Sequence, residues 1–242
     1  MNSVLPEGVQ RVAAFLAERG HAHAPRLLDE SARTAQEAAE ALGVGTGQIA
    51  KSIIFKRLPD EVAVLVVTSG DQRVDEKKLA PLVCAAGQKL SRADADFVKA
   101  RTGFSIGGVS PVAHATPVLQ VLDVSLFRFD RVWAAAGHPH GVFPASPAQL
   151  GRLTGARIED VAQGGLAPED RVRALLRARA AVLAEGEGAE VPSPCVSVCC
   201  MQPETGLCQG CLRTLDEIAA WSSASPQSKR QVWAAIATRA QA

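Results

Sequence analysis

Hydrophobic residues near the start of the chain recur at the spacing of a helix. Val9, Val12 and Leu16 fall on one face of a helix that opens near residue 6. This helix is amphipathic, so we expect it to pack on another element. A second helix is predicted after Thr34, because Thr34 and Glu37 form a capping box in which each side chain accepts a hydrogen bond from the other residue's backbone N–H.

The hydrophobic pattern then changes to short β-branched runs. Residues 52–55 and 62–67 are two such runs, and the turn-forming Pro59 and Asp60 lie between them, which predicts a hairpin within a sheet. The other elements predicted in this part of the chain are strands over 118–124 and 132–135, and helices over 75–86 and from Ser146 onward. The mixture predicts an α+β fold with a mixed, largely antiparallel sheet and surrounding helices.

The last third of the chain begins with an arginine-rich helix. Apolar residues such as Val172 and Leu176 predict a helix over 168–183, and its arginines form either a solvated outer face or a grip on RNA phosphates. Residues 185–193 are rich in Gly, Glu and Pro and are predicted to be a linker. The predicted organisation is a large domain over 1–184, the linker over 185–193 and a small module over 194–242.

Composition limits the kinds of partner that the chain can have. The 242 residues are 47% hydrophobic, enough to bury a core, and the formal net charge is +1 with basic and acidic residues intermixed. No polycationic stripe favours DNA as a partner, so any RNA contact is expected to be local. The chain shows neither a secretory signal pattern nor an apolar stretch of membrane-spanning length, which favours the cytoplasm and no membrane partner.

Several motifs occur in order through the first two thirds of the chain. They are Lys51 to Phe55 (KSIIF), Gly70 to Asp75 (GDQRVD), Thr102 to Pro111 (TGFSIGGVSP), and Ala136-Gly137-His138 followed by Ser146-Pro147. Together they resemble the YbaK/EbsC family of aminoacyl-tRNA deacylases, the freestanding relatives of the editing insertion of bacterial prolyl-tRNA synthetase. The resemblance implies the α+β fold of that family, hydrolysis of misacylated tRNA, and no cofactor in this domain.

Lys51 is the first candidate catalytic residue. It opens a predicted strand, so its ammonium can project from the end of the sheet toward an anion such as a terminal phosphate of tRNA. A lysine at the start of a strand is by itself most often a solvated charge. The resemblance implies the functional role, because a lysine at this position is the best-known functional residue of the family.

The loop from Gly107 to Pro111 is the second candidate. Its two glycines permit unusual backbone angles and Pro111 stiffens the exit, which suits a loop whose N–H groups face a ligand. The Gly-x-x-x-Pro loop of the family borders the aminoacyl pocket. The resemblance therefore implies catalytic roles for Gly107 and Gly108 and substrate contacts for Val109, Ser110 and Pro111.

Hydrolysis of an ester needs a positioned water, a proton acceptor and donors for the developing oxyanion. The sequence shows no nucleophile elbow and no catalytic triad. This agrees with the mechanism that the resemblance implies, in which water attacks with the help of a hydroxyl of the terminal adenosine. His138 is a catalytic candidate whose ordinary pKa suits base work or substrate orientation. His114 and Arg73 are further candidates for substrate binding.

The identity of the amino acid stays open at this level. The branch of the family that removes cysteine carries a serine and an acidic residue where this chain has Ala135 and Val142, and the chain has no tyrosine. Ala, Ser, Thr and Cys are all candidates. The implied partner is aminoacyl-tRNA, and an aminoacyl-tRNA synthetase is a second candidate partner. One alternative function is a module that binds an aminoacyl or adenosine end without hydrolysis.

The C-terminal segment is marked by its cysteines. Cys195, Cys199, Cys208 and Cys211 offer four thiolates in a stretch too short for its own hydrophobic core, and a metal would supply the missing stability. The spacing leaves zinc and an iron–sulphur cluster open, as well as Cys200 in place of Cys199.

Two short helices are predicted to follow these cysteines. A capping box at Thr214 and Glu217 opens the first, Ser225-Pro226 starts the second, and Trp221 and Trp233 are expected to form their core. The segment resembles a small bacterial cysteine-rich domain of unknown function that is often described as an iron–sulphur protein. A redox or interaction role for this module is the remaining alternative.

Overall fold

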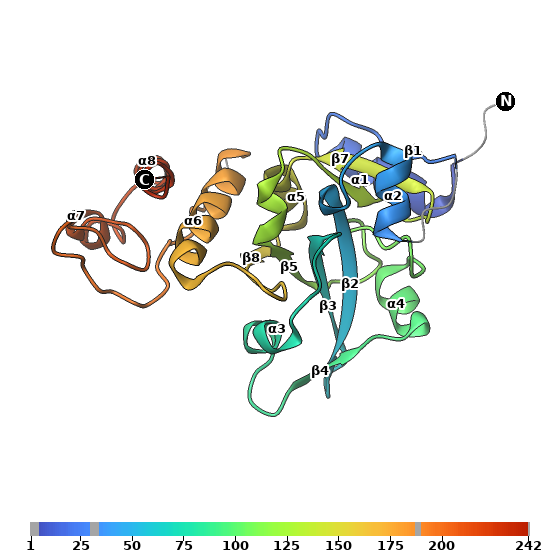
Figure 1. The fold of residues 1–242 in the computed structure, drawn as a ribbon, viewed down its shortest axis with the longest axis horizontal. Coiled ribbons are helices and arrows are strands. Elements are labelled where there is room, and N and C mark those ends of the chain that lie inside the picture. The colour runs from blue at the N-terminus through green and yellow to red at the C-terminus, as the bar shows by residue number, and fades with distance from the viewer. Residues whose placement is uncertain (1–4, 30–33, 187–189, 242) are drawn as a thin grey trace. The chain divides into compact units, whose positions relative to one another are not determined.

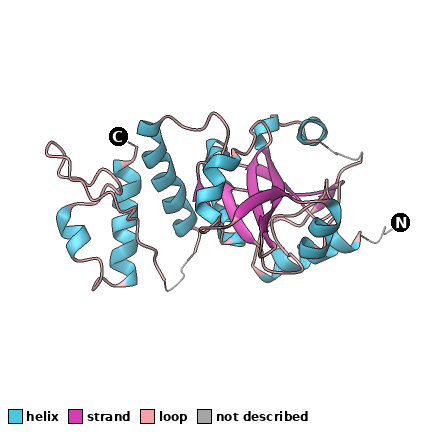
Figure 2. Ribbon diagram, turned by 90° about the horizontal axis from the view of Figure 1, so that it is seen from below, coloured by secondary structure: helices cyan, strands magenta, loops and turns pink. Residues whose placement is uncertain are grey.

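A computed structural model of the chain describes residues 5–29, 34–186 and 190–241. The chain divides into two compact units, residues 1–165 and 166–242. Figure 1 labels the elements of both units, and Figure 2 separates helices from strands by colour.

The first unit is built on one mixed sheet, with helices on both sides of it (Figure 2). Its strands are β1 (Arg26–Leu27), β2 (Ile49–Leu58), β3 (Val62–Ser69), β4 (Lys89–Arg92), β5 (Leu119–Asp123), β6 (Val132–Ala135), β7 (Gly141–Ala145) and β8 (Arg157–Glu159). The order is β1-β7-β6-β2-β3-β5-β8, and β4 pairs beside β2. The pairs β1–β7, β7–β6, β2–β3 and β2–β4 are antiparallel, and the other three are parallel. The predicted α+β class with a mixed sheet is confirmed.

The helices of this unit are bounded by the signals that the sequence carries. They are α1 (Glu7–Glu18), α2 (Ala35–Leu42), α3 (Glu76–Val83), α4 (Ala95–Thr102) and α5 (Pro147–Thr154). The capping box is present at α2: the Thr34 hydroxyl accepts from the Glu37 N–H and the Glu37 carboxylate accepts from the Thr34 N–H, each at 3.2 Å. Gly43 ends α2 in the left-handed conformation, with a φ of 67°. Local chemistry therefore fixes where this helix begins and ends.

β2 is the strand on which the candidate site depends. One of its edges pairs with β3 along residues 50–57. Its other edge must therefore hold both remaining partners, β6 at Ile49 and Ala50 and β4 from Phe55 to Leu58. Among the described residues, no strand pairs with residues 51–54 on that edge. The sheet has an opening there, and the backbone groups on an unpaired edge are available to another molecule.

The sequence does not predict β4 or α4. β4 is a short polar strand (KLSR) that gains its conformation from pairing with β2, far away in the sequence. In α4 only Phe97, Val98 and Thr102 are buried, which is too few for a clear helical pattern. Its local signals are Asp94, which accepts from the Phe97 N–H at 2.8 Å, and Gly103, which has a φ of 74°.

The second unit contains α6 (Pro168–Ala184), α7 (Leu215–Ala219) and α8 (Pro226–Arg239). Its core contains Leu176, Val191, Trp233 and Ile236, and the half-buried Trp221 packs against them. The predicted capping box at Thr214 is present as well. The prediction that both tryptophans belong to the core of this segment is confirmed.

The expected boundary after residue 184 differs from the division at residue 165. Helical periodicity gives α6 an apolar face but cannot tell which unit covers that face. Leu176 of α6 is only 1% exposed and packs in the core of the second unit together with α8. Within the expected linker, residues 187–189 lie outside the described residues, and Val191 is buried in the same core. Over the ranges that the structure describes, no helix is long and apolar enough to cross a bilayer.

Candidate active site

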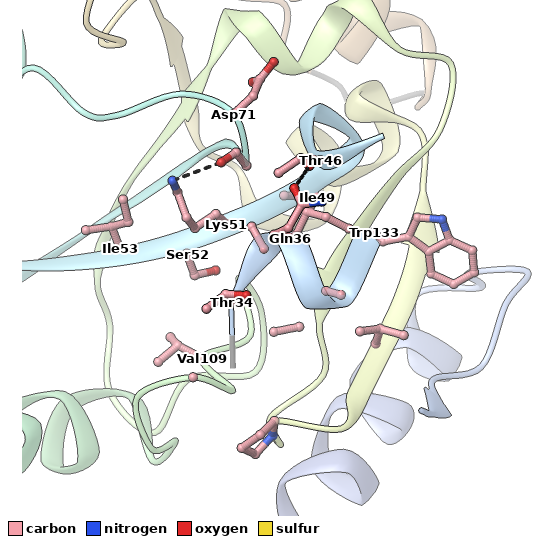
Figure 3. A pocket seen from close by; sticks show the side chains of 18 of the residues that line it. Thr34, Gln36, Thr46, Ile49, Lys51, Ser52, Ile53, Asp71, Val109 and Trp133 are labelled. Atoms are coloured by element: carbon pink, nitrogen blue, oxygen red, sulfur yellow. Dashed lines mark hydrogen bonds between the residues drawn. The ribbon is translucent and has the colours of Figure 1, made fainter. Parts of the chain in front are cut away.

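The opening beside β2 leads into a cleft of about 600 Å³, a size typical of small-molecule sites (Figure 3). Its walls come from segments far apart in the sequence: the start of α2, residues 49–53 of β2, residues 70–73 after β3, the loop at 107–109, and the turn between β6 and β7. The cleft therefore exists only in the folded sheet.

Lys51 stands on β2 at the mouth of the opening. Its Nζ donates a hydrogen bond of 2.7 Å to the carbonyl oxygen of Gln72 and lies 3.5 Å from that of Gly70 (Figure 3). Burial lowers the pKa of Lys51 below its ordinary value, the charge of Arg73 lowers it further, and Asp71 offsets part of the shift. A bound anion would offset both the burial of the Lys51 ammonium and its repulsion by Arg73. The site therefore favours a negatively charged ligand.

Asp71 is the acidic side chain among the described residues that line this cleft. Burial alone would raise the pKa of Asp71, but hydrogen bonds from Ser69 and Arg128 outweigh it, so the pKa is lowered. The Ser69 hydroxyl lies 2.7 Å and the Arg128 guanidinium 2.9 Å from Oδ1 of Asp71. A carboxylate held in this way remains ionised and engaged, which makes it a poor proton acceptor for an attacking water.

Ser52 is a site residue that the sequence analysis missed. It follows Lys51 on the strand, so the two side chains leave β2 in opposite directions, as Figure 3 shows. The Ser52 hydroxyl lines the cleft, is buried, and has no hydrogen-bond partner among the described residues. Because a buried polar group without a partner is costly, this hydroxyl is available to a ligand. The only sequence signal for it is its place beside Lys51.

The glycine loop approaches the cleft through a tight turn. The Gly108 N–H donates to the carbonyl of Ser105 at 3.0 Å, and Gly107 at the third position of this turn has a φ of 91°. Gly108 lies against the next wall: a Cβ there would come within 2.6 Å of the carbonyl carbon of His138. Glycine is therefore favoured at position 107 by the backbone angle and at position 108 by the lack of space for a side chain.

His138 borders the cleft on the turn between β6 and β7. Its Nδ1 accepts a hydrogen bond of 3.2 Å from the backbone N–H of His140. The neutral ring consequently carries its proton on Nε2, which makes that nitrogen a hydrogen-bond donor. This arrangement suits orientation of a substrate carbonyl better than removal of a proton.

The other predicted site residues divide into two groups. Arg73, Gly107 and Val109 line the cleft together with Lys51 and His138. Gly108, Ser110 and Pro111 are buried behind the loop surface. His114 lines neither this cleft nor its neighbour: its Nε2 lies 2.8 Å from the carbonyl oxygen of Ser110, and its ring meets Phe104 edge-on. Burial lowers the pKa of His114, which suits a neutral side chain that holds the loop.

A second cleft of about 770 Å³ adjoins the first on the other side of Lys51. The two share Lys51, Ser52, Ile53, Arg73, Gly107 and Val109. Beyond these residues, the second cleft extends along β2 toward the start of α3 and the end of β4.

The cysteines of the second unit form two interacting pairs. The thiol of Cys195 hydrogen-bonds with that of Cys199, which raises the pKa of Cys199. Burial alone would raise the pKa of Cys208, but hydrogen bonds from the backbone N–H groups of Gly210 and Cys211 outweigh it, so the pKa is lowered. N–H donors around a Cys-x2-Cys pair stabilise the thiolate, the form of cysteine that binds metals.

The sulphur atoms do not form a closed metal site as they stand. Over residues 5–29, 34–186 and 190–241, no group of three or more His, Cys, Asp or Glu side chains is arranged to hold a metal ion. The donor chemistry nevertheless fits one, because Cys211 Sγ accepts from the buried Arg213 at 3.4 Å and Cys195 Sγ accepts from the Ser197 N–H at 3.4 Å. Ser197 and Cys199 also hold left-handed backbone angles, unusual outside glycine.

Two family models match the chain, one in each unit. An aminoacyl-tRNA editing domain matches residues 29–153, and a protein family of unknown function (DUF1289) matches residues 193–240. Among curated proteins, the uncharacterized protein YwhH of Bacillus subtilis (strain 168) is 34% identical over 130 residues, which are 54% of this chain and 80% of YwhH. The proline–tRNA ligase of Thermoanaerobacter sp. (strain X514) is 31% identical over 91 residues, 38% of this chain but only 16% of the ligase.

A solved structure is similar to about two thirds of the chain. A crystal structure described as "a putative trans-editing enzyme for prolyl tRNA synthetase" aligns with a TM-score of 0.61 and 41% identity, covering 66% of this chain and all of that protein. The editing-domain model spans just over half of the 242 residues, including Lys51, the glycine loop and His138. By this measure, and by its similarity to YwhH, the chain belongs to the aminoacyl-tRNA editing domain family.

Proposed function

We propose that the first unit hydrolyses the ester bond that joins a small amino acid to the terminal adenosine of a mischarged tRNA. The observation that carries this proposal is the opening beside β2, where one cleft is lined by Lys51 and by Ser52, whose hydroxyl has no hydrogen-bond partner among the residues that the structure describes. Lys51 would bind a phosphate of the tRNA end, and Ser52 would donate to or accept from the ribose or the acyl group.

The chemistry of the cleft supports attack by water rather than by a side chain. Asp71 is engaged by Arg128, and the Nε2 of neutral His138 is a donor. We infer that the protein supplies binding and orientation, with His138 and the loop at Gly107–Val109 polarising the ester carbonyl. The proton acceptor is then a hydroxyl of the terminal ribose beside the ester, which needs no group from the chain.

The apolar part of the cleft supports a small, uncharged amino acid. This part is lined by Ala35, Ala38, Ile49, Trp133, Ala135 and Val142. These apolar side chains offer few hydrogen-bond partners to a charged side chain. Alanine, serine, threonine and cysteine are the proposed substrates, since a hydrophobic pocket distinguishes them by only about 1–3 kcal/mol.

The first experiment measures loss of the ester from tRNAs charged with Ala, Ser, Thr, Cys or Pro. We expect rapid loss from one or two of them and at least about tenfold slower loss with Lys51→Ala, because a hydrogen bond to a charged group contributes about 1.5–3 kcal/mol. Lys56→Ala is the matched control: Lys56 lies on the same strand, pairs with Glu61 and lines neither cleft. No loss from any substrate would favour the non-catalytic binding module.

We further propose that the cysteines of the second unit bind a metal, either zinc or an iron–sulphur cluster. Two thiol pairs, one of them surrounded by backbone N–H donors, are the support for this proposal. When bound, the metal would join Cys195 and Cys199 to Cys208 and Cys211 and stabilise the segment that carries them.

Metal analysis of the purified chain tests this proposal. A colourless protein with one equivalent of zinc, or a brown protein with iron and labile sulphide, would support it, and a Cys208→Ser variant should lose that metal. Cys200→Ser is the matched control for the ligand set. A protein that is purified under reducing, metal-replete conditions and contains neither metal would overturn the proposal.

A further inference from the structure

The second cleft differs in chemistry from the first, although the two meet at Lys51. Four cationic side chains line it, Lys51, Arg73, Lys77 and Arg92, against the two carboxylates of Asp75 and Glu76. The cations therefore outnumber the anions by two (four less two). The first cleft instead ends in the apolar wall formed by α2, β6 and β7.

The two carboxylates differ in how firmly they are held. Asp75 caps α3 and accepts a hydrogen bond of 2.9 Å from the backbone N–H of Lys77. Glu76 lies 3.9 Å from Arg92, and the side chain of Arg92 is 90% exposed, so that pair is weakly held. Among the described residues, neither carboxylate forms an ion pair with Arg73 or Lys77.

The cationic side chains of Arg73 and Lys77 have no partner among the described residues. Both are exposed, and in the part of the chain that the structure describes neither side chain forms a hydrogen bond or an ion pair. The second cleft therefore carries cations besides Lys51: Arg73, which both clefts share, and Lys77 and Arg92, which line only the second.

An exposed apolar side chain lies beside these cations. Ile106, at the tip of the turn before Gly107, is 60% exposed and lines the second cleft only. Sites for single-stranded nucleic acid combine a positively charged groove along the backbone with side chains that pack against the bases, most often aromatic ones. Ile106 offers an apolar, non-aromatic surface for such a contact. Every tRNA ends in such a strand, with phosphates before its terminal adenosine.

We propose that the second cleft binds the penultimate nucleotides of the single-stranded 3′ end of tRNA, with Arg73, Lys77 and Arg92 at the phosphates and Ile106 against a base. The inference rests on the proposed function, since it assigns the acyl group to the apolar first cleft and the ester to the junction at Lys51. It adds the direction from which the strand arrives and the residues that hold it.

The test measures binding of a non-aminoacylated RNA tetranucleotide ACCA by fluorescence polarisation at several salt concentrations. Fluorescein is attached through a 5′ phosphate, so that the probe carries four phosphates, one for each of Lys51, Arg73, Lys77 and Arg92. We expect Arg73→Ala, Lys77→Ala and Arg92→Ala each to weaken binding about threefold to tenfold. Each should also reduce the slope of log affinity against log salt by about 0.7, the value for one phosphate contact on a single strand. Lys89→Ala is the control, because Lys89 lies on β4 with Arg92 but lines neither cleft.

A second probe separates phosphate contacts from base contacts. ACCA with uncharged methylphosphonate linkages should bind weakly and equally to the wild type and the three variants, whereas Ile106→Ser should weaken both probes. Equal binding of normal ACCA to the wild type and the three variants would overturn the proposal.

Hydrolysis assays keep this outcome distinct from failure of the proposed function. The proposal predicts a higher KM for charged tRNA in Lys77→Ala. If charged tRNA is hydrolysed with the same KM by wild type and Lys77→Ala, the function stands and the second cleft is not the path. If ACCA binding depends on these residues but no ester is lost, the path stands and the hydrolytic function fails.

Discussion

Lys51 makes the stability of the first unit depend on pH. Burial and Arg73 lower its pKa, so between that lowered pKa and the ordinary value of 10.5 the unfolded chain binds a proton that the folded chain does not. Unfolding free energy rises with pH wherever the unfolded state holds more protons. The cost of the buried charge is therefore present in full at lower pH and disappears as pH rises through this window.

This sign gives a prediction at the scale of one residue. The difference in unfolding free energy between the wild type and Lys51→Met, measured by urea unfolding, should shift in favour of the wild type as pH rises toward 10.5. Methionine fills a similar volume without the charge. A difference that is constant with pH, or that moves toward the variant, would contradict the assigned cause. Saturating ACCA RNA should reduce the shift, because a phosphate near Lys51 restores the charged form.

At the scale of elements, the site depends on the contact between the glycine loop and the β6–β7 turn. Gly108→Ala would place a methyl group 2.6 Å from the His138 carbonyl carbon, so the loop must move away from that turn. We expect a loss of about 1–3 kcal/mol of stability from this overpacking. Deacylation should fall at least about tenfold with it, since the N–H groups that we propose to face the ester would lose their positions.

Gly107→Ala provides the comparison for this prediction. A methyl group there meets nothing within 4 Å, but the φ of 91° is unfavourable for an L-residue and costs about 1–2 kcal/mol. We expect the two variants to lose similar amounts of stability. Deacylation should fall clearly further in Gly108→Ala than in Gly107→Ala. Equal loss of activity in both would mean that the contact with His138 does not position the loop.

At the scale of the whole molecule, two units with separate cores match two separate families. The editing-domain match ends at residue 153, and the match of the second unit begins at residue 193. α6 lies between these matches and belongs to the second unit, because Leu176 packs with Trp233 and Ile236. The second unit therefore has a helical core of its own, which the cysteine segment adjoins.

The sequence by itself determined the central hairpin and the ends of several helices. Capping at Thr34 and Ser146, the β-branched runs on either side of Pro59, and the glycines that end helices all act through neighbours along the chain. Such local chemistry can be recognised before any tertiary contact is known. The motif resemblance added Lys51 and the glycine loop, and both border the cleft.

Tertiary structure alone decided where the site opens and what borders it. The gap on β2 exists because β6 and β4 pair with opposite ends of one edge, a long-range arrangement that no local pattern encodes. Within the described part of the chain, the same packing left the Ser52 hydroxyl without a partner, moved His114 behind the loop, and assigned α6 to the second unit. Periodicity shows that a face is apolar, but only packing shows what covers it.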